Sequence, residues 1–315
     1  MSLKLNSELL TPGTNKVSFP SEGHQLAGLL FLPEGFDASQ KYPTIVMTMA
    51  FNQVKEQTGS VYGKRLAALG YAAMVFDHRG FGDSEGKLRS YEYTPAKLEG
   101  LSDAISFLRM HDFVDRARFF GLGVCAGASH IVTTALTDKR LKAIATVSGM
   151  LNNAASLFGV MDRETAVAAL TAANDAHQKY YETGIQENVD ILGMSEPPAE
   201  DAPSTMHEGY DYYMTARAGR ETNPNYTHMA PLFVNEDYPR YNATAMAPFL
   251  YTPFLGIVGK DADTAPLTQG FVEAASEPKE LYEIEGASHV SLYDIDKDVD
   301  RAVTKINEFF QKHGS

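Results

Sequence analysis

Short apolar runs alternate with amphipathic stretches along most of the chain. This alternation is typical of a mainly parallel sheet that is covered by helices. Two apolar stretches within residues 15–35 predict an antiparallel hairpin, which leads into the sheet. Six further runs predict strands at 44–50, 71–77, 117–124, 141–149, 254–259 and 279–286, and helices are expected at 56–69, 95–110, 126–138, 265–276 and 296–312. We therefore expect an α/β fold with an eight-stranded and mostly parallel sheet flanked by helices.

The alternation is interrupted between Met150 and Pro253. This interval has helical stretches, a proline-rich loop at 195–205 and many tyrosines, so we predict a helical cap at 150–245. The core domain would then comprise residues 1–149 and 246–315. We expect two cap tyrosines, Tyr210 and Tyr213, to bind substrate, although such aromatic side chains equally suit the packing of the cap itself.

Composition excludes several classes of protein. The formal net charge of -13 argues against a nucleic-acid partner, because phosphates would be repelled. The chain has no apolar run of about 18 residues and no signal-like N-terminal segment, so we expect no membrane association and a cytoplasmic location. A single cysteine allows no internal disulfide and no cysteine-rich zinc site, and we expect no cofactor and no metal. The sequence does not define the oligomeric state, and a homodimer is compatible with it.

The stretch Gly123-Val124-Cys125-Ala126-Gly127 has the spacing of a nucleophile elbow. A predicted strand ends just before it and a helix-compatible run follows. The flanking glycines leave room for a strained, exposed nucleophile. We interpret the only cysteine of the chain as this nucleophile, with a buried core side chain as the alternative.

A second stretch, Gly82-Asp83-Ser84-Glu85-Gly86, has the same spacing around a serine. Here the predicted strand stops five residues before the first glycine, at Asp77. Polar residues and then a proline follow in place of a helix. We therefore interpret Ser84 as a turn residue and keep it as the rival nucleophile.

A base and an acid should follow the nucleophile along the chain. His289 comes directly after the last predicted strand, in a loop at its carboxyl end, where such sheets keep their sites. Asp261 and Asp263 lie in the loop after the strand at 254–259. The residues alone do not separate these two candidates for the acid.

Two backbone N–H groups should stabilise the developing oxyanion. The first belongs to Ala126, directly after the nucleophile. The second should come from the loop after the strand at 44–50, with Phe51 as the first candidate and Asn52 as the second. A nearby imidazolium and a helix N-terminus are expected to lower the pKa of the Cys125 thiol.

Four stretches together resemble the α/β-hydrolases, and in particular the cysteine-nucleophile branch related to dienelactone hydrolase and the YcjY-like hydrolases. They are VKEQ at 54–57, FDHRGFGDSEG at 76–86, GVCAGA at 123–128 and GASHVSLYD at 286–294. The resemblance implies a triad of Cys125, Asp263 and His289, because the AD-T pattern of these relatives falls on Ala262-Asp263-Thr264.

The chain departs from the pattern of these relatives at MTMAFNQ, residues 47–53, where they have a glycine-rich stretch.

We expect an enzyme that hydrolyses a small ester, thioester or lactone through a thioacyl intermediate, with a small-molecule acyl substrate as its partner. Transfer of the acyl group to another acceptor is the first alternative. A non-catalytic binding module on the same fold is the second.

Overall fold

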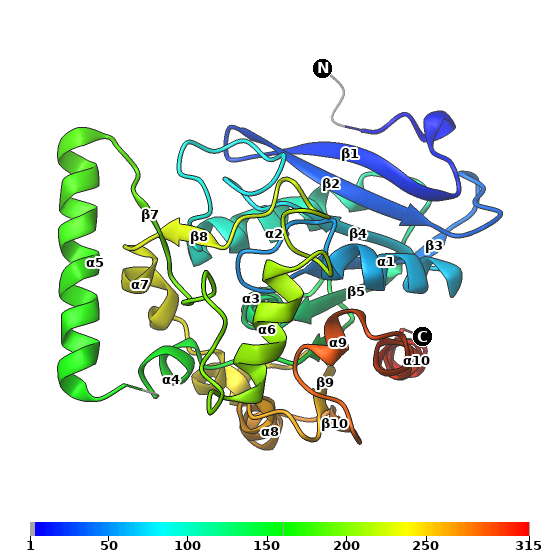
Figure 1. Cartoon of the computed structure of the whole chain (residues 1–315). Helices are drawn as coiled ribbons and strands as arrows, with labels where there is room; N and C mark the ends of the chain where they lie inside the picture. The colour runs from blue at the N-terminus through cyan, green and yellow to red at the C-terminus, as the bar shows by residue number, and fades with distance from the viewer. Residues whose placement is uncertain (1–3, 160, 315) are drawn as a thin grey trace.

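An eight-stranded sheet forms the centre of the computed structural model, which describes residues 4–159 and 161–314 (Figure 1). The strands are β1 (Gly13–Ser21), β2 (His24–Leu32), β3 (Tyr42–Thr48), β4 (Ala72–Phe76), β5 (Val114–Val124), β6 (Ala143–Val147), β9 (Phe254–Gly259) and β10 (Lys279–Ile284). Their order is β1-β2-β4-β3-β5-β6-β9-β10. The β1–β2 and β2–β4 pairs are antiparallel and all other pairs are parallel. The predicted hairpin and the predicted eight-stranded sheet are thus confirmed.

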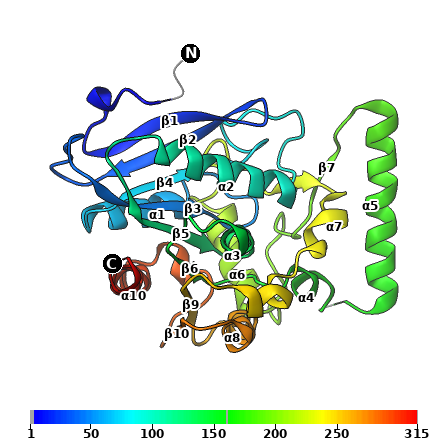
Figure 2. The same ribbon diagram turned by 180° about the vertical axis from the view of Figure 1, so that it is seen from behind.

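Five long helices cover the two faces of the sheet (Figures 1 and 2). Helices α1 (Thr58–Ala68) and α10 (Asp296–His313) lie on one face, and α2 (Thr94–Arg109), α3 (Ala126–Thr137) and α8 (Ala265–Ala274) lie on the other. Successive side chains of a strand point to opposite faces. Ile45 of β3 therefore packs in the core layer of Tyr62 from α1, and Val46 packs in the layer of Leu101 from α2. The sequence pattern predicts all five helices to within two residues at each end.

The chain between β6 and β9 leaves the sheet and passes over the carboxyl ends of the parallel strands (Figure 1). Its elements are α4 (Asn153–Phe158), α5 (Arg163–Thr183), β7 (Asn188–Asp190), α6 (Ser204–Met214), β8 (Met229–Pro231), α7 (Val234–Asp237), and the 3-10 helices η2 (Tyr238–Arg240) and η3 (Ala243–Phe249). Strands β7 and β8 form a small antiparallel pair. Helix α5 stands at the outer edge and buries only Ala173. This is the interval that the sequence pattern sets apart as a cap.

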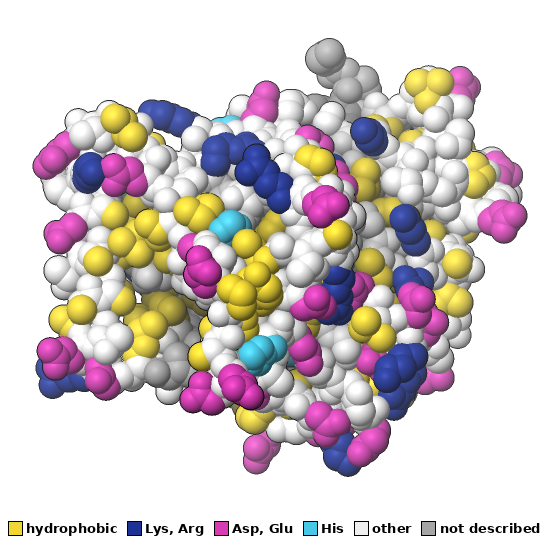
Figure 3. All heavy atoms as spheres, in the orientation of Figure 1, with side chains coloured by type: hydrophobic (Ala, Val, Ile, Leu, Met, Phe, Trp, Pro, Cys, Tyr) yellow, Lys and Arg dark blue, Asp and Glu magenta, His cyan; other side chains and the backbone are white. Residues whose placement is uncertain are grey.

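The surface carries charged side chains of both signs (Figure 3). On the face shown, hydrophobic side chains gather between α5 and α6, and charged side chains surround them. Within residues 4–159 and 161–314, no helix is long and apolar enough to cross a membrane. The same residues contain no cluster of three or more His, Cys, Asp or Glu side chains arranged to hold a metal ion.

Candidate active site

Cys125 lies at the sharp turn between β5 and α3. Its backbone has φ 54° and ψ -117°, a conformation that a non-glycine residue adopts only when its surroundings hold it there. Its N–H donates to the carbonyl oxygen of Val147, and its carbonyl oxygen accepts from Ala128 and Met150. A Cβ at Gly123 would lie 2.6 Å from the carbonyl oxygen of Gly127, so the turn needs a glycine there. The turn has the predicted elbow geometry.

Both predicted N–H donors surround the sulfur atom. The backbone N–H groups of Phe51 and Ala126 are in hydrogen-bond contact with the Cys125 thiol, as is the hydroxyl of Tyr293. Burial nevertheless raises the pKa of the thiol, because it outweighs these three donors. The expected lowering of the Cys125 pKa is therefore wrong, and the resting group is a thiol.

The buried ion pair of Glu92 and Lys97 fixes the loop that carries Phe51. The N–H of Asn52 donates to Glu92 Oε1 at 2.6 Å, and Glu92 Oε2 lies 2.5 Å from the ammonium nitrogen of Lys97. Asn52 has φ 60°, and its side-chain amide donates to the carbonyl oxygen of Thr227 at 2.7 Å. Asn52 thus shapes the loop, and the prediction that it serves as a donor to substrate is wrong because Glu92 already accepts its N–H.

His289 lies in the loop after β10, as predicted, with 3% of its surface exposed. Its Nδ1 is 2.5 Å from the hydroxyl oxygen of Thr264, and its Nε2 is 3.0 Å from the hydroxyl oxygen of Tyr293. Burial lowers the pKa of His289 to about 4, although the charge of Asp263 acts to raise it. The imidazole is therefore neutral at neutral pH and can accept a proton.

The two candidate acids have different surroundings. The carboxylate of Asp263 accepts a hydrogen bond from Thr205 of α6, and its charge acts on the imidazole of His289. The direct partner of His289 Nδ1 is Thr264, one residue further along the chain. Asp261 lies exposed on the same loop, and its N–H donates to the carbonyl oxygen of Ala287. Of the two, only Asp263 is placed to influence His289, and it does so without a direct hydrogen bond.

A cavity of about 230 Å³ opens above the thiol. Among the described residues, no Asp, Glu, Lys or Arg lines it. Apolar side chains dominate its wall, with Phe51 on the sheet side and Tyr238 packed edge-to-face against it. Further apolar lining comes from Met150, Leu157, Ile191, Leu192, Met194 and Val290. The cavity suits an uncharged, apolar group next to the sulfur atom.

One of the two predicted cap tyrosines reaches this cavity. Tyr213 lines it, and its hydroxyl accepts a hydrogen bond from Gln53 at 3.0 Å. Thr205, Gly209 and Tyr213 are spaced by four along α6 and therefore share the face that lines the cavity. Tyr210 is not on that face, because each helical residue is turned by about 100° from its neighbour, and the prediction for Tyr210 is wrong.

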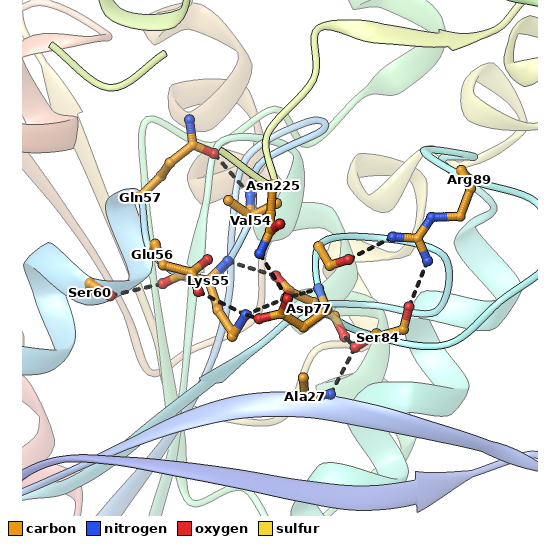
Figure 4. Close-up of polar contacts among 12 residues, drawn as sticks. Ala27, Val54, Lys55, Glu56, Gln57, Ser60, Asp77, Ser84, Arg89 and Asn225 are labelled. Carbon is orange, nitrogen blue, oxygen red and sulfur yellow. Dashed lines mark hydrogen bonds and ion pairs between the residues drawn. The ribbon is translucent and has the colours of Figure 1, made fainter. Parts of the chain in front are cut away.

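Ser84, the rival nucleophile, is fixed in a turn. Its hydroxyl donates to the carbonyl oxygen of Asp77 at 2.6 Å and accepts from the N–H of Ala27 at 2.8 Å (Figure 4). The ammonium group of Lys55 also joins this turn and contacts Asp77 (Figure 4). Its nitrogen lies 2.7 Å from a carboxylate oxygen of Asp77 and 2.6 Å from one of Asp83. Burial acts to lower the pKa of Lys55, but its acidic partners raise it overall. This ion-pair network connects two stretches of the resemblance, VKEQ and FDHRGFGDSEG, and gives both a structural role.

Three residues close to Cys125, to His289 or to the Phe51 loop escaped the sequence interpretation. They are Tyr293, Thr264 and Glu92. Tyr293 follows His289 by four residues within a short helical region that includes α9 (Ser291–Asp294), and this spacing brings side chains together. That spacing was the available signal for Tyr293. No local pattern distinguishes Glu92, because the N–H group that it accepts from belongs to Asn52, 40 residues away.

Comparison with known proteins shows the family and the fold of the chain. Residues 22–236 match the family model described as X-Pro dipeptidyl-peptidase (S15 family). The protein YcjY of Escherichia coli strain K12 is 30% identical over 308 residues, which cover 95% of this chain and 98% of YcjY. The crystal structure of hypothetical protein PA2218 from Pseudomonas aeruginosa superimposes with a TM-score of 0.84 at 26% identity and covers 99% of each chain. Thiohydrolase aneE of Aspergillus aculeatus is 27% identical over 282 residues, covering 86% of this chain and 84% of aneE.

Proposed function

The chain belongs to the family described as X-Pro dipeptidyl-peptidase (S15 family) and is an ester-acting α/β-hydrolase, and from this premise we propose that Cys125 is its nucleophile. The substrate would be a small, apolar ester, thioester or lactone. The observation that carries this proposal is the position of the Cys125 sulfur, on a strained elbow and between the N–H groups of Phe51 and Ala126.

Both the thiol and the imidazole of His289 are neutral at rest, because burial raises the pKa of the thiol and lowers that of the imidazole to about 4. His289 would therefore remove the thiol proton by general-base catalysis during the attack, and the resting enzyme would not hold a thiolate–imidazolium ion pair. As the sulfur bonds to the carbonyl carbon, the two N–H groups that now surround it would stabilise the carbonyl oxygen. His289 would then protonate the leaving group and activate the water that hydrolyses the thioacyl intermediate.

Asp263 would act on His289 through its charge, without a direct hydrogen bond. The charge of Asp263 stabilises the imidazolium, and the hydroxyl of Thr264 fixes the ring through Nδ1. We infer that Thr264 orients the ring in the place where a triad carboxylate would otherwise lie.

The cavity argues against a peptide with a free N-terminus as the substrate. An α-ammonium group inside a wall without a carboxylate would be desolvated and unpaired, which costs several kcal/mol. An uncharged acyl group has no such cost. The apolar wall therefore favours acyl esters and thioesters within this family's chemistry.

Acyl transfer is the second candidate, and the same wall supports it. An apolar cavity limits the water near the thioacyl carbonyl, so an alcohol or amine that binds there would compete well with water. Product analysis with and without added alcohols and amines separates transfer from hydrolysis.

The test of the nucleophile uses the single thiol of the chain. The native protein is treated with p-nitrophenyl acetate and, separately, with an acetyl thioester of N-acetylcysteamine, and intact masses are measured. We expect one acetyl group on Cys125, a burst of leaving group, and loss of both in Cys125→Ala. Ser84→Ala is the matched control and should retain the adduct.

Two results would contradict the proposal. An acetyl group that persists in Cys125→Ala would place the nucleophile elsewhere. A protein that labels with iodoacetamide only in urea, and with no smaller thiol reagent in the folded state, would make Cys125 a core side chain.

A further inference from the structure

The hydroxyl of Tyr293 lies between the two groups that the chemistry must connect. It is 3.0 Å from His289 Nε2 and in hydrogen-bond contact with the Cys125 thiol. The other ring nitrogen of His289 is taken by Thr264 at 2.5 Å. Both ring nitrogens therefore have partners, and neither partner is the sulfur atom.

We propose, resting on the function proposed above, that Tyr293 is a catalytic residue that relays the thiol proton from Cys125 to His289. The relay requires one arrangement of the protons on these groups. In the arrangement that the relay requires, Nδ1–H donates to Thr264, the Nε2 lone pair accepts from the Tyr293 hydroxyl, and the Tyr293 oxygen accepts from the thiol.

The step balances without any further reactant. As the sulfur–carbon bond forms, the thiol proton moves to the Tyr293 oxygen and the original phenolic proton moves to His289 Nε2. The π electrons of the carbonyl move to its oxygen, which the N–H groups of Phe51 and Ala126 stabilise. Tyr293 ends the step neutral with an exchanged proton, His289 becomes an imidazolium, and the sulfur becomes a thioether-like centre in the tetrahedral intermediate.

The surroundings of Tyr293 favour a neutral hydroxyl over a phenolate. The side chain is 2% exposed, and burial raises the pKa of its hydroxyl well above the ordinary value. Tyr212 packs edge-to-face on its ring at 5.2 Å, which holds the ring in place. A fixed, neutral hydroxyl can donate and accept at once, and a relay requires both.

The test compares Tyr293→Phe with Tyr212→Phe. Each removes one hydroxyl from the same aromatic cluster, but the Tyr212 hydroxyl bonds to Thr58 and not to the reacting groups. We expect Tyr293→Phe to slow acetylation by p-nitrophenyl acetate about a hundredfold, the range of general acid–base effects. We also expect it to shift the pH profile of Cys125 alkylation by iodoacetamide to higher pH, because the thiolate that reacts would lose the Tyr293 hydroxyl as a hydrogen-bond donor. Tyr212→Phe should change neither.

A measurement on the unaltered protein keeps the test independent of folding of the variant. In mixtures of H2O and D2O, a relay that moves two protons in the acylation step gives a curved dependence of the rate on deuterium fraction. A linear dependence indicates one proton in flight and would overturn the relay.

The remaining outcomes are also decisive. A Tyr293→Phe protein that is acetylated faster than the unaltered one would show that the hydroxyl blocks His289 and is a gate, which refutes the relay. Equal rates would show that it is a packing residue. In both cases Cys125→Ala would still abolish the adduct, so failure of the relay is distinguishable from failure of the proposed nucleophile.

Discussion

Burial of a neutral His289 should make the stability of the protein depend on pH in a defined window. The folded-state pKa of His289 is about 4, whereas an exposed histidine in the unfolded chain has a value of about 6.5. Because the unfolded chain binds the proton more readily, the contribution of His289 is fully present above about pH 6.5 and is lost as the pH falls toward 4. The gap between the two pKa values corresponds to about 3 kcal/mol in the free energy of unfolding.

The perturbation is His289→Gln, which removes the titration while keeping a side chain of similar size. Urea unfolding is followed by circular dichroism at intervals between pH 4 and pH 8 for both proteins. We expect the difference in free energy of unfolding, unaltered protein minus variant, to fall by about 3 kcal/mol from pH 7.5 to pH 4. His78 and His130 are also buried with pKa values well below the ordinary value, but they titrate in both proteins and cancel in the difference.

The exposed His207 of α6 supplies the matched control, and His207→Gln should leave the pH dependence of stability unchanged. Parallel curves for the unaltered protein and His289→Gln would refute the reasoning. That result would mean that the imidazole of His289 is solvated in the folded protein.

Three further substitutions probe the supports of the site. Gly127→Ala should lower stability and abolish acetylation, because a Cβ there would overlap the carbonyl group of Thr48. Calorimetry measures the stability and the burst of leaving group measures acetylation. A normal burst would argue against a tightly packed elbow. Lys55→Met leaves its carboxylate partner buried and unpaired and should cost about 3–5 kcal/mol in urea unfolding, so a loss below about 1 kcal/mol would mean that water reaches the network. Asp263→Asn should move the acid limb of the pH profile of acetylation to lower pH and reduce kcat, because the charge of Asp263 raises the pKa of His289. Asp261→Asn should do neither, and the reverse ranking would assign the role of the acid to Asp261.

The sequence predicts the sheet well because its strands are defined locally. Strand β9 (Phe254–Gly259) is a buried apolar run, and its predicted and observed bounds coincide. The elbow is equally local, since two glycines and one cysteine determine a turn of five residues. The fold and the position of the elbow turn were therefore predictable from short stretches of chain.

The surroundings of Cys125 were less predictable because they depend on distant residues. The loop conformation at Asn52 is set by Glu92, 40 residues away, so the choice between Phe51 and Asn52 as donor could not be made from the sequence. The direction of the Cys125 pKa shift depends on how deeply the thiol is buried, which spacing does not reveal. The partner of His289 Nδ1 was missed by one residue, because a loop does not fix side-chain direction as a helix or strand does.

Helix α5 buries a single alanine, and Leu192 in the outer wall of the cavity is 40% exposed. Substitutions at such positions change stability by only about 0.5 kcal/mol. The elbow and the Glu92–Lys97 pair, by contrast, lie in the interior, where almost any exchange is costly. The outer wall of the cavity therefore tolerates substitution far better than the elbow and the Glu92–Lys97 pair do. Descendants of such a chain could acquire new acyl specificities by drift in the outer wall, while their catalytic chemistry stayed unchanged.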